Sequence, residues 1–187
     1  MPLPKRIILG IDPGLATTGW GAIETEGRTV ILKGYGVLLT PSSDSLPVRL
    51  QSIHLQLSEL LRRFQPSVVA IEELFFTKFA VSIASTAQAR GVILFTVAQE
   101  GIPLAEYNPR AVKMALTGFG SASKIQMQTM LMRSFGLKEI PKPDDAADAV
   151  SMALCHVQTN SDLKVHSDRR SRAAFESELL ARSEGRK

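Results

Sequence analysis

The chain has 187 residues, of which 44% are hydrophobic and 21% are charged, so it is long enough to bury one substantial core. That composition excludes a globally disordered protein and a coiled-coil rod. The 22 lysines and arginines exceed the 18 aspartates and glutamates, which gives a formal net charge of +4. This charge is compatible with a polyanionic partner but does not identify one.

The first 40 residues predict three strands. Residues 7–11 form a continuous apolar run that ends at Asp12-Pro13-Gly14, the pattern of a buried strand that enters a turn. Residues 17–23 and 30–39 predict two further strands, separated by a polar hairpin region.

From residue 46 the pattern alternates between helices and strands. Apolar residues recur at intervals of three and four over 46–64, which predicts an amphipathic helix that Pro66 ends. Further strands are predicted at 67–71 and 102–106. Helices are predicted at residues 81–99 and in a stretch that begins at Pro109 and breaks at Gly118. A third is capped by Ser123 and runs to residue 135, and a fourth runs from Asp144 or Asp145 to residue 157. This order predicts an α/β fold whose mixed sheet combines an antiparallel meander with parallel crossovers.

The apolar and cysteine content predicts a soluble cytoplasmic protein. The apolar run near the N-terminus is too short for a signal peptide or a membrane span. The single cysteine, Cys155, excludes an intramolecular disulfide and a cysteine-rich zinc site. Because it lies in an apolar stretch, we expect it to be a core residue.

The composition changes near residue 160. We expect one folded domain over residues 1–158 and a basic, disordered tail over 159–187, because the later residues are charged and offer few apolar anchors. The alternative is that this tail contacts DNA phosphates instead of remaining disordered in solvent.

Two carboxylates end buried strands. Asp12 follows the first apolar run, and Glu72 follows the strand predicted at 67–71. Ligands bind at the carboxyl ends of strands in open α/β sheets, and a carboxylate there is partly desolvated unless a cation compensates it. Taken singly, each acid has a structural alternative: Asp12 can form a turn with Pro13, and Glu72 can lie just past the sheet edge.

A second pair of acids begins the last predicted helix. Asp145 and Asp148 are three residues apart and therefore share one face of its first turns. Helix capping is an alternative that explains Asp144 or Asp145, since acids near a helix N-terminus are favourable. It explains Asp148 less well, because that residue lies a full turn further in, among alanines.

The four acids have no histidine or cysteine cluster near them and so offer only oxygen ligands. Such sites suit magnesium or manganese rather than zinc. Two such ions can activate a water and stabilise the leaving oxygen of a phosphodiester. A basic chain with an acidic metal site is therefore a candidate nuclease.

Five short motifs follow one another along the chain. They are Gly10-Ile11-Asp12-Pro13-Gly14; Ala70-Ile71-Glu72-Glu73-Leu74-Phe75; Gln88-Ala89-Arg90-Gly91; Val112-Lys113 followed by Gly118 to Lys124; and Asp145-Ala146-Ala147-Asp148-Ala149. In this order they resemble the motifs of the RuvC family of Holliday-junction resolvases, and the resemblance covers residues 7–157. The resemblance implies a ribonuclease-H-like fold with a five-stranded mixed sheet flanked by helices. It also implies a homodimer that makes paired, metal-dependent nicks in four-way DNA junctions during recombination and repair, leaving 5′-phosphates.

The resemblance also implies roles for individual residues. Asp12, Glu72, Asp145 and Asp148 match the metal-binding catalytic acids, which selects Glu72 over Glu73 and Asp145 over Asp144. The ions implied are magnesium, with manganese as an alternative, two in each site. Lys113 and Lys124 resemble catalytic-face lysines, where a fixed ammonium offsets charge that develops at the scissile phosphate. Phe75 resembles an aromatic residue that stacks on a base at the junction centre, and an ordinary core phenylalanine is its alternative.

Other assignments concern partners and DNA contacts. Lys78, Arg90 and Arg110 are candidates for contacts to the DNA backbone. The small-residue helix 81–99 is the predicted dimer contact, and the family implies a branch-migration helicase complex as a partner. The role of Asp144 is open. His156 is either a hydrogen-bonded helix residue or a proton-transfer group behind the metal ligands.

Two other functions compete with a nuclease. An actin-like or sugar-kinase-type ATPase also has an N-terminal strand, an aspartate and glycine-rich turns, but such enzymes need a second lobe for which this chain is too short. A non-catalytic accessory protein would bind junctions equally well with or without magnesium and would never nick them.

Overall fold

The sheet has the predicted mixed topology. A computed structural model describes residues 5–27, 29–73 and 80–159, and within these ranges five strands form one sheet in the order β3-β2-β1-β4-β5. The strands are β1 (Arg6–Asp12), β2 (Thr17–Glu26), β3 (Thr29–Leu39), β4 (Val68–Glu72) and β5 (Leu104–Tyr107). β1, β2 and β3 form the antiparallel meander, whereas β4 pairs parallel to both β1 and β5.

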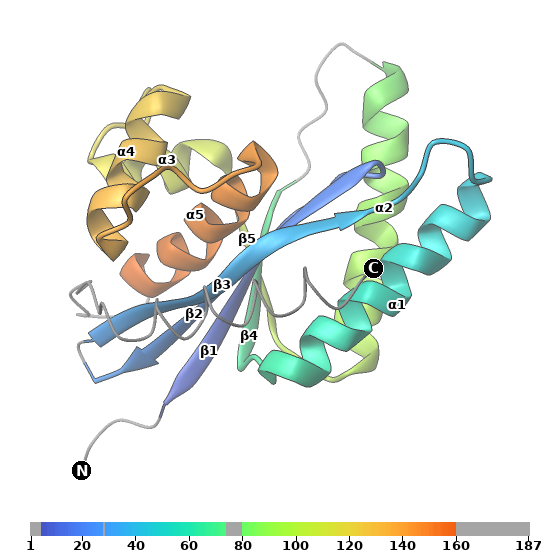
Figure 1. Cartoon of the computed structure of the whole chain (residues 1–187), viewed down its shortest axis with the longest axis horizontal. Helices are drawn as coiled ribbons and strands as arrows, with labels where there is room; N and C mark the ends of the chain where they lie inside the picture. Colours follow the sequence, from blue (N-terminus) through green and yellow to red (C-terminus); the bar gives the residue numbers. More distant parts are fainter. Residues whose placement is uncertain (1–4, 28, 74–79, 160–187) are drawn as a thin grey trace.

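Helices cover both faces of this sheet (Figure 1). On one face lie α1 (Leu46–Phe64) and α2 (Ala80–Gln99), and on the other lie α3 (Pro109–Thr117), α4 (Lys124–Phe135) and α5 (Asp144–Thr159). Each face has its own core. Within the described ranges, no helix is both long enough and apolar enough to cross a lipid bilayer.

Local signals in the sequence account for the helix ends. The Asn108 side chain accepts a hydrogen bond from the Ala111 amide (2.8 Å), which caps α3. Ser123 and Gln126 form a reciprocal capping box at the start of α4, as the Ser123 cap predicted. Gly118 ends α3 in a left-handed conformation (φ 78°) that a residue with a side chain adopts only at a cost.

The alternation of side chains along the central strands decides which residues reach each core. Ile8 packs into the core beneath α3, α4 and α5, whereas Leu9 and Ile11 pack into the core beneath α1 and α2. By the two-residue period of a strand, Asp12 lies on the same face as Ile8 and Gly10. In β4, Ala70 packs on the α5 side, so Glu72 also lies on that face.

Glycines in β1 and β2 allow α5 to lie directly on the sheet. A Cβ atom at Gly10 would collide with the backbone of Ala149, and one at Gly19 would collide with the carbonyl of Asp145. Gly21 meets the backbone of Val150 in the same way. Because these positions lack side chains, the helix that carries two of the acids approaches the end of β1 closely.

Replacing Gly10 with alanine tests this close approach. The methyl group would meet helix backbone, which cannot rotate away, so we expect Gly10→Ala to lower the free energy of unfolding by about 3 kcal/mol. Chemical denaturation followed by circular dichroism measures the change. Gln51→Ala is the control: Gln51 is exposed on α1, so we expect the free energy of unfolding to change by less than about 0.5 kcal/mol. Equal destabilisation by both variants would contradict the role of Gly10.

Candidate functional site

The first two predicted acids lie at the ends of neighbouring parallel strands. The β1–β4 register runs from Ile8–Val68 to Ile11–Ile71, and Asp12 and Glu72 are each the next residue of their strand. Both are partly buried, and strand alternation directs both towards α5. This geometry supports the choice of Glu72 over Glu73, because Glu73 is the first residue beyond β4 and alternation would direct it to the opposite face.

The turn after Asp12 is held by side-chain hydrogen bonds. Thr18 Oγ1 donates to the carbonyl of Gly14 (2.7 Å), and Thr40 Oγ1 donates to the carbonyl of Leu15. The Thr40 amide also donates to the carbonyl of Ala16 (3.1 Å). The backbone that follows Asp12 is therefore fixed by β2 and by the end of β3, and this rigidity holds the carboxylate in place.

Asp145 and Asp148 reach the same region from the first turns of α5. The electrostatics show the convergence, since the charges of Asp148, Glu72 and Asp145 all act on Asp12. Burial, followed by these like charges, raises the pKa of Asp12 to about 8. Asp12, Glu72 and the Asp145–Asp148 pair, which come from three distant parts of the sequence, thus form one acidic cluster.

The other acids of the cluster share this environment. Burial raises the pKa of Glu72, and the charge of Asp148 raises it further. Burial also raises the pKa of Asp148, and the nearby ammonium of Lys124 opposes that rise only in part. Repelling, partly buried carboxylates are costly without a cation, so the cluster attracts positive charge.

A cleft of about 250 Å³ opens beside these acids. Lys113 and Lys124, which were both predicted to lie on the catalytic face, line it together with Glu72 and Asp148. The cleft is therefore lined by both acidic and basic side chains. The remaining lining residues are Pro109, Val112, Met127, Ser151 and Met152.

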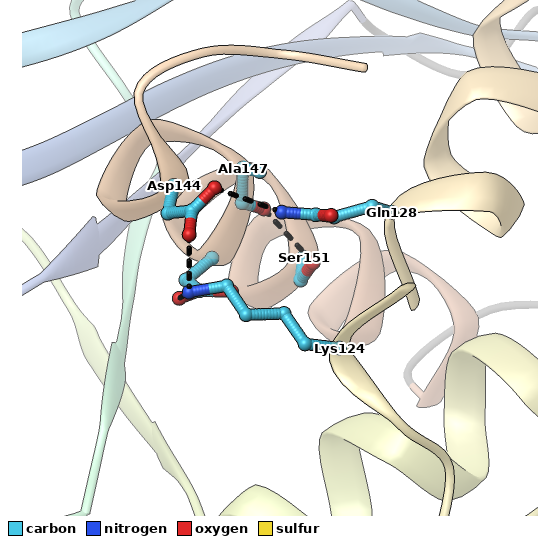
Figure 2. Close-up of polar contacts among 6 residues, drawn as sticks. Lys124, Gln128, Asp144, Ala147 and Ser151 are labelled. Atoms are coloured by element: carbon cyan, nitrogen blue, oxygen red, sulfur yellow. Dashed lines mark hydrogen bonds and ion pairs between the residues drawn. The ribbon is translucent and has the colours of Figure 1, made fainter. Parts of the chain in front are cut away.

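Lys124 bridges two acids of α5, and Figure 2 shows its contact with Asp144. Its Nζ lies 3.1 Å from Asp144 Oδ2 and 3.2 Å from Asp148 Oδ2. Gln128 donates to the other oxygen of Asp144 (3.0 Å). The hydrogen bond from Lys124 keeps the pKa of Asp144 below its usual value. Asp144 is therefore a lysine partner at the rim of the cluster.

The donor set fits hard divalent cations. The four acids supply only oxygen atoms, and their mutual repulsion would be relieved by a bound cation, which is the chemistry that magnesium and manganese favour. In the part of the chain that the structure describes, no three acid, histidine or cysteine side chains are arranged so that they could hold a metal ion. Lys124 instead contacts one oxygen of Asp148. Metal binding at these four residues would therefore require their side chains to rearrange.

The remaining predicted site residues have different outcomes. Phe75 and Lys78 lie outside the described residues. Arg110 is exposed at the start of α3, and its side chain lies against Gly120.

His156 Nδ1 lies 2.7 Å from the Tyr107 hydroxyl, and burial lowers the pKa of its imidazole. This contact favours the hydrogen-bonded alternative for His156. Cys155 is buried in the core, as predicted.

Two features of the site were not predicted from the sequence. Gln128 is buried and orients Asp144, and its spacing of four residues from Lys124 on α4 is the signal that could have revealed it. The guanidinium of Arg90 pairs with Glu106 and also donates to the carbonyl of Glu72 (3.3 Å). No local pattern indicates that pairing, because α2 and β5 meet only in the folded chain.

Comparison with known proteins links this arrangement to one family. The family described as crossover junction endodeoxyribonuclease RuvC matches residues 8–156. A protein of that name from Syntrophomonas wolfei is 46% identical over 152 residues, which cover 81% of this chain and 88% of that protein. The protein of the same name from Endomicrobium trichonymphae is 52% identical over 154 residues, which cover 82% of this chain and 81% of that one.

Solved structures agree with the fold. Thermus thermophilus RuvC in complex with a Holliday junction substrate superposes with a TM-score of 0.76 at 35% identity, covering 81% of this chain and 92% of that one. The yeast mitochondrial Holliday junction resolvase superposes with a TM-score of 0.59 at 17% identity, covering 81% of this chain and 77% of that one, which supports the fold alone.

Asp12→Asn tests the strain within the acidic cluster. An ordinary aspartate ionises near pH 3.8, whereas the folded, metal-free protein holds the Asp12 proton up to about pH 8. Between these values the folded state binds more protons than the unfolded state, so the parent protein loses stability as pH rises through this window. Asparagine cannot ionise. In EDTA, the melting temperature of Asp12→Asn should therefore exceed that of the parent at pH 8, and the difference should shrink towards pH 4.

Calorimetric melts at pH 4, 6 and 8 measure this difference. The exposed Asp44 offers a matched control, because Asp44→Asn removes a carboxylate outside the cluster and should show no such pH-dependent gain. A difference between Asp12→Asn and the parent that stays constant with pH would rule out the raised pKa.

Proposed function

The chain belongs to the RuvC family of crossover junction endodeoxyribonucleases, and we propose that it resolves four-way DNA junctions by paired nicks in opposed strands. The observation that carries this proposal is the acidic cluster of Asp12, Glu72, Asp145 and Asp148 beside a lysine-lined cleft. The matched family is a nuclease family, and nothing in the comparisons supports the ATPase or the non-catalytic accessory protein as an alternative.

The chemistry follows from the ligand set. Asp12, Glu72, Asp145 and Asp148 would hold two magnesium ions, with manganese as an alternative. When bound, such ions activate a water molecule and stabilise the leaving oxygen of a phosphodiester. The carboxylates would hold these ions near the carboxyl ends of β1 and β4, beside the cleft that a sugar–phosphate strand would enter. The products would carry a 5′-phosphate and a 3′-hydroxyl.

The two lysines of the cleft have a separate task. Lys113 and Lys124 line the same cleft as Glu72 and Asp148, and their ammonium groups would stabilise negative charge that develops on the scissile phosphate. Asp144 accepts a hydrogen bond from Lys124 and is itself held by Gln128. Lys124 would therefore keep its ion pair with Asp144 when the Asp148 carboxylate binds a cation instead.

DNA outside the cleft needs further contacts. Arg110 is exposed on α3, three residues before Lys113. Its guanidinium would add a second basic group for DNA phosphates next to the cleft. Phe75 and Lys78 remain candidates for base stacking and backbone contact. These contacts position a junction without reading its sequence.

A homodimer would present two such clefts to the two opposed strands of a junction. The outer face of α2 supports this proposal. Its exposed positions recur at helical spacing and are mostly small or apolar: Ala84, Gln88, Gly91, Phe95 and Ala98. Phe95 is 63% exposed, and the Cβ position of Gly91 faces open space. A glycine inside a helix is unfavourable by itself, so close approach by a second helix would explain it.

The main experiment is cleavage of a synthetic four-way junction with and without magnesium. We expect symmetric nicks only when the metal is present and only in the junction, with a matched duplex left intact. Glu72→Gln should lower the cleavage rate by about 100-fold or more, because it removes a metal ligand. Glu73→Gln should cut at close to the parent rate, since Glu73 lies beyond the strand.

These two variants separate the possible outcomes. Junction binding without any cleavage would support the non-catalytic accessory protein instead. Equal loss of activity in Glu72→Gln and Glu73→Gln would contradict the assignment of Glu72 as the ligand. Denaturing gels that map the nicked strands provide both measurements.

The dimer is tested by Gly91→Arg. A long cation on the outer face of α2 should prevent a second helix from approaching, so we expect folded monomers in sedimentation velocity experiments. Gln51→Arg adds the same charge on the exposed surface of α1 and should remain dimeric. An unchanged dimer for Gly91→Arg would place the contact elsewhere, and a monomeric parent protein would refute the dimer itself.

A further inference from the structure

Arg90 is a nearly buried cation that faces the sheet. Its side chain is only 13% exposed, although it belongs to α2 and was predicted to contact DNA. The guanidinium forms an ion pair with Glu106 of β5, and its Nε donates to the backbone carbonyl of Glu72 (3.3 Å). A buried arginine is stable only when its charge is paired and its donors are used, and these two contacts meet that need.

The carbonyl that Arg90 binds lies just beyond the point where β4 stops pairing with β1. The β1–β4 register ends at Ile11–Ile71, one residue before Glu72. On the opposite side, β5 still supports the chain, because the Glu73 amide donates to the carbonyl of Tyr107 (2.9 Å). Arg90 thus supplies a hydrogen bond to the backbone at the residue that carries a site carboxylate.

Glu106 holds Arg90 in this position. In the β4–β5 register, Glu106 lies opposite Ile71, immediately next to the Glu72–Tyr107 pair. Its carboxylate binds Nη2 while Nε points to the Glu72 carbonyl. The planar guanidinium therefore joins α2 to the ends of two strands, which a lysine ammonium, as a point charge on a flexible stem, cannot do with the same geometry.

We propose that Arg90, held by Glu106, is a positioning residue that fixes the backbone of Glu72 for metal binding, rather than a contact to DNA. This inference rests on the proposed function, because it assigns Glu72 to the divalent-cation site. Glu72 ends β4 and lies one residue beyond its pairing with β1, so the hydrogen bond from Arg90 adds a contact that restrains this backbone. Positioning groups behind metal ligands typically contribute about 10- to 100-fold in metal affinity or activity.

Two variants distinguish positioning from DNA contact. Arg90→Lys keeps the positive charge but loses the Nε donor, so positioning predicts weaker metal binding, whereas a DNA-backbone contact would largely survive. Glu106→Gln keeps Arg90 but removes its ionic partner. Positioning predicts a loss in the same direction as Arg90→Lys, whereas a DNA contact predicts tighter junction binding, because a negative charge has been removed beside the cation.

The experiment measures manganese binding without DNA. MnCl₂ is titrated into the full-length protein by isothermal calorimetry, and melting temperatures in EDTA confirm that each variant folds. We expect Arg90→Lys and Glu106→Gln each to weaken manganese binding by about 10-fold and to lower kcat for junction cleavage by a similar factor. The Kd for a four-way junction in EDTA should stay within about twofold of the parent value.

Two control variants make the same kinds of substitution at exposed positions away from the Arg90–Glu106 pair. Glu100→Gln removes an exposed carboxylate just after α2, and Arg62→Lys makes the conservative change on exposed α1; both should match the parent protein. Unchanged manganese binding in both Arg90→Lys and Glu106→Gln would overturn the inference, as would tighter junction binding by Glu106→Gln. If the parent binds manganese but does not cut junctions, the proposed function fails, while weaker binding by the two variants would still support positioning by Arg90.

Discussion

The direct contact between α5 and the glycines of β1 and β2 is the constraint on which the site depends. Gly10, Gly19 and Gly21 leave no side chain between the strands and the helix backbone. Only at that short separation can the first turns of α5 bring Asp145 and Asp148 within electrostatic range of Asp12. A single methyl group between the two layers would move two acids away from the other two.

This closeness has an energetic cost in the metal-free protein. Burial and like charges raise the pKa of Asp12 to about 8, and burial also raises the pKa of Glu72 and of Asp148. The raised pKa values thus lower the stability of the metal-free protein at the proposed cation site, and such perturbed pKa values are common at functional sites. Lys124 offsets part of that cost. Partial burial lowers the pKa of Lys124, but its contacts with Asp144 and Asp148 outweigh burial, and the pKa is raised overall.

The site is held from both faces of the sheet. On the α5 side, Gln128 and Asp144 hold Lys124 at the rim of the cleft. On the opposite side, Arg90 of α2 reaches the backbone of Glu72. The acids themselves come from two strands and one helix, so their relative positions depend on how three separate elements are fixed. A mixed sheet covered on both faces can supply such supports from either layer.

The sequence by itself determined the elements, their order and the identity of the acids. Hydrophobic period, glycine and proline positions and helix caps are local properties, and they placed the strands and helices within a few residues of their observed ends. The motifs of the resemblance selected Asp12, Glu72, Asp145 and Asp148. Only the tertiary structure decided that Lys124 pairs with Asp144, and that Arg90 turns to Glu106 and the Glu72 carbonyl instead of outwards. Those contacts join residues 16 to 20 positions apart, and their formation depends on the distance between packed layers, which no local pattern encodes.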